Sequence, residues 1–90
     1  MRIYELVIEP DREDHIARHG VVVAEVEDIT SGNPFISRTR QRYHRLIGQT
    51  AAGRYLTVIV GFRGDGVYGL VTAREADQAE RRLYQRHRRD

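Results

Sequence analysis

The sequence predicts an α+β fold of two layers, in the order β-α-α-β-β-β-α, with an antiparallel sheet packed by helices. Three observations support this. Residues 54–63 are nearly all branched or aromatic, which is typical of a strand. Two segments with helix start and stop signals precede them. Short turns join the last three expected strands, which should therefore form an antiparallel meander with helices on one face and the other face open to a ligand.

The N-terminal third predicts one strand and two helices. Residues 2–8 are rich in branched and aromatic side chains and are expected to form a strand. A helix is expected over 10–19, because Pro10 suits its first position, acidic residues follow in the first turn, and Gly20 is a natural stop. Apolar residues at helical spacing predict a second helix over 22–31.

The remaining chain predicts three strands and a final helix. Residues 35–48 alternate sharply and are expected to form one strand, followed by the strand over 54–63. A Gly-Asp-Gly turn then leads into a strand over 67–71. Thr72 and Glu75 fit a capping box that starts the last helix, and the basic tail 86–90 is expected to fray.

Composition narrows the classes of function. Ninety residues predict a single domain, 1–90, and the absence of cysteine excludes disulfides and thiolate metal sites. No apolar run is long enough to span a membrane and no leader is evident, so a cytoplasmic protein without membrane contact is expected.

Charge is unevenly distributed along the chain. All 15 cationic residues are Arg, and residues 31–90 carry twelve of them against five acids. Guanidinium groups make forked contacts to phosphate, so this part suits a nucleic acid or an acidic partner. A solvated charged surface is the simpler alternative for any single Arg.

The most informative cations lie in the expected strand over 35–48. Alternation would place Arg38, Arg40, Arg42 and His44 on one face, about 7 Å apart. This stripe is a candidate RNA-binding surface. The alternative is an edge strand that carries charge to prevent aggregation.

A second group of cations comprises Arg54, Arg74 and Arg81, with Arg74 expected in the first turn of the last helix. Arg can stabilise developing negative charge but cannot exchange a proton, so a ribonuclease site needs another group. His44 is the first candidate for proton transfer, and Glu80 and Tyr84 are the reserves. Taken singly, each of these three residues is more often structural than catalytic.

A metal site is not expected. His15 and His19 stand four residues apart on the first helix, but the Glu of a metalloprotease motif and a third ligand are both missing. We therefore predict no metal and no other cofactor.

Three short blocks, in order and with suitable spacing, resemble the BrnT family of toxins in the RelE superfamily. The first is Arg18-His19-Gly20-Val21. The second runs from Arg42 through Ile47-Gly48 to Gly53-Arg54, Leu56 and Val58. The third is Val71-Thr72-Ala73-Arg74-Glu75-Ala76, followed by Glu80-Arg81 and Tyr84. The resemblance spans about residues 15–84.

The resemblance implies a RelE-like fold and metal-independent RNA cleavage, in which the 2′-hydroxyl attacks the adjacent phosphate. It implies neutralisation by a cognate antitoxin, and contact with operator DNA only through the toxin–antitoxin complex. By position, it makes Arg42, Arg54, Arg74 and Arg81 the residues expected to matter. A homodimer or a heterotetramer is compatible with the sequence.

Two departures from the family pattern leave an alternative open. Gly69 stands where the family often has a basic residue, and the family's N-terminal Asp-x-x-Lys is replaced by Pro10-Asp11-Arg12. The chain could therefore bind nucleic acid or an antitoxin without cutting, or be a plain structural subunit. The ribonuclease hypothesis requires the guanidinium groups to converge on one concave surface.

Overall fold

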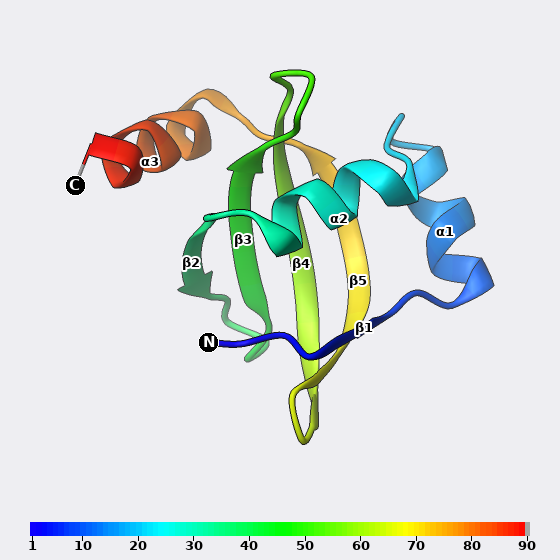
Figure 1. Cartoon of the computed structure of the whole chain (residues 1–90). Helices are drawn as coiled ribbons and strands as arrows, with labels where there is room; N and C mark the ends of the chain where they lie inside the picture. Colours follow the sequence, from blue (N-terminus) through cyan, green and yellow to red (C-terminus); the bar gives the residue numbers. More distant parts are fainter. Residues whose placement is uncertain (90) are drawn as a thin grey trace.

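The computed structural model describes residues 1–89 and has a single five-stranded sheet with the order β1-β5-β4-β3-β2 (Figure 1). The strands are β1 (Glu5–Val7), β2 (Phe35–Arg38), β3 (His44–Gln49), β4 (Tyr55–Gly64) and β5 (Val67–Glu75). The α+β class is confirmed, and β2 to β5 form the expected antiparallel meander. The sheet is nevertheless mixed, because β1 runs parallel to β5 at the edge.

The first two helices lie close to their predicted positions. Helix α1 spans Pro10–Ala17 and α2 spans Val23–Ser31. Gly20, between them, has a φ of +73°, a left-handed conformation that glycine adopts without steric strain. The Glu25 side chain accepts a hydrogen bond from the Val22 amide at 3.1 Å, which satisfies one free donor at the start of α2.

The predicted single strand over 35–48 is wrong, because the chain turns back over residues 39–43. The Thr39 amide donates to the Tyr43 carbonyl at 2.9 Å, and the Tyr43 amide donates to the Thr39 hydroxyl at 3.1 Å. Arg42 adopts a φ of +67° to close this turn. Arg40 and Arg42 therefore lie in a hairpin turn, and the continuous cationic stripe expected from alternation does not form.

The predicted start of the last helix is also wrong. Strand β5 continues to Glu75, so Thr72 and Glu75 lie in the sheet, and helix α3 spans Gln78–Arg89. The capping box forms one step later: the Asp77 amide donates to Glu80 Oε1 at 3.0 Å and the Glu80 amide donates to Asp77 Oδ1 at 2.8 Å. The expected frayed tail is helical through Arg89, and Asp90 lies outside the described residues.

Helices cover both faces of the sheet. Leu46 and Ile47 are neighbours in β3 and so point to opposite faces. Leu46 belongs to the large core beneath α1 and α2, whereas Ile47 packs in a smaller cluster with Tyr84 of α3. The second face is therefore partly covered, where the sequence suggested an open face. In Figure 1, α2 crosses the sheet and α3 lies beyond one end of it.

Candidate functional site

Glu80 is the centre of an ion-pair network that joins α3 to the sheet. Its side chain is buried, with 3% of the residue exposed. Arg74 on β5 donates two hydrogen bonds to its carboxylate, at 2.7 and 3.0 Å. Arg45 on β3 approaches Oε2 at 3.5 Å. Forked, charge-assisted pairs of this kind are among the stronger polar interactions in proteins, so Glu80 fixes the position of α3.

The surroundings of Glu80 favour its charged form. Burial alone would raise the pKa of Glu80, but the hydrogen bonds from Arg74 and the Asp77 amide outweigh burial and hold that pKa below its ordinary value. The hydrogen bond to Glu80 in turn raises the pKa of Arg74. Since the carboxylate oxygens already accept several bonds, this geometry suits a structural role better than proton transfer. The catalytic roles assigned to Glu80 and Arg74 stay predictions.

Arg54 also has a carboxylate partner. It immediately precedes β4, and its Nη1 donates to the Glu25 carboxylate at 3.1 and 3.2 Å and to the Gly20 carbonyl at 2.7 Å. These contacts tie the corner between α1 and α2 to the start of the central strand. No side-chain hydrogen bond within residues 1–89 uses Nε or Nη2 of Arg54, which leaves donors free for a ligand.

A groove lies where β4 begins, β5 ends and α3 starts. One part, of about 200 Å³, is lined by Gly53, Arg54, Tyr55, Glu75, Ala76 and Arg81. A second part, of about 450 Å³, shares Ala76 and Arg81 and adds Gln78, Arg82 and Gln85. We call these two parts together the α3 groove. Arg54 and Arg81 thus share one concave surface.

Two residues of the α3 groove, Tyr55 and Glu75, are absent from the sequence-based candidates. The Arg81 guanidinium lies over the Tyr55 ring at 4.6 Å from its centre. The Glu75 side chain is exposed and forms no ion pair within residues 1–89. The sequence pattern places Glu75 in a capping box, so it was not considered as a site residue. The length of the strand over 54–63 could have revealed Glu75, because a ten-residue strand needs a pairing partner longer than 67–71.

Tyr84, the other reserve candidate for proton transfer, is largely buried. It is 8% exposed, and its ring packs edge-on against Tyr55 at 6.1 Å between centroids. The Arg88 guanidinium lies over the Tyr84 ring, 5.9 Å from the ring centre. These contacts make Tyr84 part of the small core beneath α3, and a catalytic role for it stays a prediction.

His44, Arg38 and Arg42 lie far from the α3 groove. His44 pairs with Val60, whereas Tyr55 pairs with Gln49 at the opposite end of β3. His44 and Gln49 are five residue steps apart along the strand, which is about 17 Å. His44 and Arg38 also face the α1 and α2 side of the sheet, as Val60 does, while Arg74 faces α3. The expectation that all candidate cations converge on one surface is therefore wrong, and the ribonuclease hypothesis now depends on Arg54 and Arg81, the two candidates that line the α3 groove.

The His44 imidazole is held in a partly buried, cationic environment. Burial lowers the pKa of His44, and the nearby Arg38 charge lowers it further. Its Nδ1 is buried and has no hydrogen-bond partner within the described residues. The ring packs edge-on against Tyr68 at 5.7 Å. This imidazole is too distant to exchange a proton with a phosphodiester held by Arg54 and Arg81.

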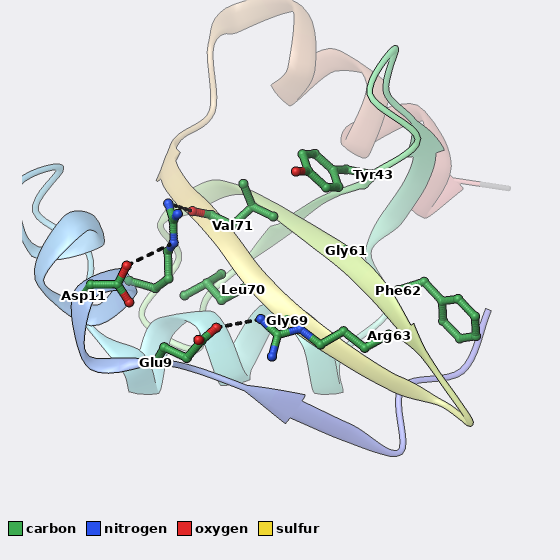
Figure 2. A pocket seen from close by; sticks show the side chains of 10 residues that line it. Glu9, Asp11, Tyr43, Gly61, Phe62, Arg63, Gly69, Leu70 and Val71 are labelled. Atoms are coloured by element: carbon green, nitrogen blue, oxygen red, sulfur yellow. Dashed lines mark hydrogen bonds and ion pairs between the residues drawn. The ribbon is translucent and has the colours of Figure 1, made fainter.

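Figure 2 shows a third hollow, of about 320 Å³, over β4 and β5. Gly61 and Gly69 are paired in its floor, and the Arg63 guanidinium occupies the space that a side chain at position 69 would need. Arg63 donates to Glu9 at 2.6 Å, and Arg12 is also paired with a carboxylate. Because both guanidiniums are paired, this hollow has no excess charge for phosphate.

The two histidines at metal-ligand spacing make other contacts. His15 Nε2 lies 3.0 Å from the Thr72 hydroxyl, and His19 Nδ1 lies 3.1 Å from the Ala73 carbonyl. Across residues 1–89, no three His, Cys, Asp or Glu side chains are grouped so as to hold a metal ion. In the same part of the chain, no helix has the length and apolar character needed to cross a membrane.

The sequence matches no protein-family model and no curated protein. Its structure is similar to the 1.1 Å crystal structure of the Brucella abortus ribonuclease toxin BrnT. The TM-score is 0.65 at 23% sequence identity, over 82% of this chain and 97% of that chain. This likeness confirms the fold implied by the sequence resemblance: the chain has the fold of the BrnT ribonuclease toxin.

Proposed function

We propose that the chain is the toxin of a bacterial toxin–antitoxin pair and a metal-independent endoribonuclease, with the α3 groove as its active site. The observation that supports this most directly is the meeting of Arg54, Arg81, Tyr55 and Glu75 in one groove. An unpaired carboxylate can accept a proton and two cations can stabilise the negative charge that develops on the phosphate, and metal-independent RNA cleavage can use both. The shared fold with a ribonuclease toxin points to the same activity.

In the proposed reaction, Arg54 and Arg81 bind the scissile phosphate. Glu75 accepts the proton of the 2′-hydroxyl as the 2′-oxygen attacks phosphorus, and the bond to the 5′-oxygen breaks. Water supplies the proton to the leaving oxygen, giving a 2′,3′-cyclic phosphate and a 5′-hydroxyl end. The guanidiniums stabilise the extra negative charge of the transition state. Glu75 takes the place of His44 as proton acceptor, because His44 lies at the far end of β3.

A cognate antitoxin is the second part of the proposal. The exposed cations of α3 that form no ion pair within residues 1–89 are Arg81, Arg82, Arg86, Arg88 and Arg89. An acidic antitoxin segment laid along α3 would neutralise these charges and cover the groove. A small acidic protein encoded beside this gene, which protects cells when co-expressed, is the expected finding.

The test is cleavage of a labelled single-stranded RNA by the purified chain in excess chelator. Arg81→Gln and Glu75→Gln are each expected to reduce the rate by about 100-fold or more. Glu27→Gln, an exposed substitution on α2, is the matched control and should leave the rate unchanged. An RNA with 2′-deoxyribose at the cut site should resist cleavage. Loss of activity in His44→Gln with full activity in Glu75→Gln would move the proton acceptor back to His44.

A non-catalytic binding module is the second candidate, and one observation favours it. Arg54 and Arg74 are each paired with a carboxylate, Glu25 and Glu80, so part of their charge is already compensated. The same experiment separates the two functions. RNA that stays intact through long incubation, while still binding the chain in a manner weakened by Arg81→Gln, would reject the ribonuclease and support the module.

A further inference from the structure

A pocket of about 490 Å³ lies at the opposite end of the sheet from the α3 groove. We call it the hairpin-end pocket. Its walls come from the turn between β2 and β3, from the β4–β5 end of the sheet and from the first residue. The lining residues are Met1, Arg38, Arg42, His44, Phe62 and Tyr68. Nothing in the proposed cleavage reaction uses this pocket.

The hairpin-end pocket carries uncompensated positive charge. Arg38 and Arg42 are both exposed, and neither forms an ion pair or a side-chain hydrogen bond within residues 1–89. In contrast, Arg12 and Arg63 in the hollow of Figure 2 are both paired. Two free guanidiniums, one at the end of β2 and one in the turn that follows, can bind a phosphate through forked hydrogen bonds.

The same pocket presents an aromatic ring to solvent. Phe62 is 59% exposed, although it lies next to the buried Tyr68 with 5.3 Å between ring centroids. Tyr68 in turn packs edge-on against His44. The three rings pack against one another in a row, and of these Phe62 is the ring exposed to solvent. The sheet is irregular here, with a register shift between Phe62 and Gly64.

We propose that the hairpin-end pocket binds one nucleotide of a single-stranded nucleic acid, with its base stacked on Phe62 and its phosphate held by Arg38 and Arg42. Exposed aromatic rings beside unpaired cations are the usual means of binding single strands without reading their sequence. An acidic peptide would use the guanidiniums but would not require the ring, so the exposed Phe62 favours the nucleotide. The proposal deepens the proposed function and rests on it, by giving RNA a second contact remote from the cut.

The experiment follows the backbone amides of the ¹⁵N-labelled chain by NMR during titration with 5′-AMP, and separately with adenosine and inorganic phosphate. The amides of His44, Phe62 and Tyr68 are expected to shift with 5′-AMP, and to shift less with either component alone. Binding of a labelled single-stranded DNA oligonucleotide, which lacks the 2′-hydroxyl and cannot be cut by the proposed reaction, gives the affinity.

The variants test the two contacts separately. Phe62→Ala should weaken oligonucleotide binding about tenfold, and Phe62→Tyr should restore it. Arg42→Gln should weaken binding and reduce its salt dependence. Arg40→Gln is the matched control: it removes the same charge from the same turn, but Arg40 does not line the pocket. The NMR spectrum of each variant also reports whether it is folded.

Each outcome bears on one proposal. Shifts confined to the α3 groove, or equal losses in Arg40→Gln and Arg42→Gln, would overturn the hairpin-end site while leaving the proposed cleavage intact. An octaglutamate peptide that binds the pocket equally well in Phe62→Ala would assign it to an acidic protein, and would also overturn the proposal. Oligonucleotide binding that depends on Phe62 in a chain that never cuts RNA would support the pocket and reject the ribonuclease.

Discussion

The substitution Glu80→Gln tests whether the network around Glu80 stabilises the fold. It keeps the shape of the side chain and an oxygen that can accept the Asp77 amide, but it removes the charge that faces Arg74 and Arg45. Removing one partner of a fully buried ion pair costs about 3–5 kcal/mol. The Arg74 and Arg45 side chains are 42% and 31% exposed, so water can solvate them in the variant. We therefore expect a smaller loss of about 2 kcal/mol.

Urea unfolding followed by circular dichroism measures this loss. For a chain of this size, about 2 kcal/mol corresponds to a decrease in Tm of roughly 8–16 °C. Glu27→Gln changes the same chemical group at an exposed position of α2 and should alter stability by less than about 0.5 kcal/mol. If Glu80→Gln is as stable as this control, Glu80 does not hold α3 on the sheet, and a catalytic role for its carboxylate becomes more attractive.

Four further predictions concern stability. Burial and Arg38 lower the pKa of His44, so the unfolded chain binds a proton at this residue at higher pH than the folded chain does. The urea midpoint should therefore fall as the pH decreases below about 6.5. The His44→Gln variant should lack this decrease. The pKa of Glu80 is also lowered in the folded chain, so a second loss of stability should begin below about pH 4.3. A urea midpoint that does not change between pH 7 and pH 3 would contradict both pH predictions. Gly48→Ala should cost about 1–3 kcal/mol in the same assay, because its Cβ would lie 3.2 Å from the buried Ile29 side chain; wild-type stability would show that the core can yield. Arg54→Gln should cost about 1 kcal/mol, decreasing at high salt, and a salt-independent loss would argue against its ion pair as the cause.

The features that sequence could predict are those set by short-range signals. Pro10 at the start of α1 and Gly20 after its end bound the helix within two residues of the expected range. The branched residues of β4 and the Gly-Asp-Gly turn located the central hairpin. In each case the local preference and the tertiary arrangement agree, which is when sequence patterns are most reliable.

The errors arise where tertiary contacts override a local pattern. Residues 39–43 contain no glycine, proline or asparagine, and the turn relies on Arg42 in a left-handed conformation and on the Thr39 hydroxyl. The Thr72-x-x-Glu75 motif is a valid capping box, but pairing with β4 keeps it in the sheet. The continuous cationic stripe does not form for the same reason: once 35–48 splits into a hairpin, its cations gather at one end of the sheet, where Arg38 and Arg42 line the hairpin-end pocket.

The distribution of paired and free arginines leads to a last prediction. Within residues 1–89, five guanidiniums are paired with carboxylates and so contribute less to binding a polyanion, namely those of Arg12, Arg45, Arg54, Arg63 and Arg74. Among the free cations, Arg81 lies in the α3 groove and Arg42 in the hairpin-end pocket, at opposite ends of the sheet. For a single strand, each lost contact between a cation and a phosphate should make the negative slope of log affinity against log salt concentration shallower by about 0.7. Since the two sites share no contacts, the reductions in Arg42→Gln and Arg81→Gln should add in the double variant. A double variant with the slope of either single variant would mean that RNA occupies only one site at a time.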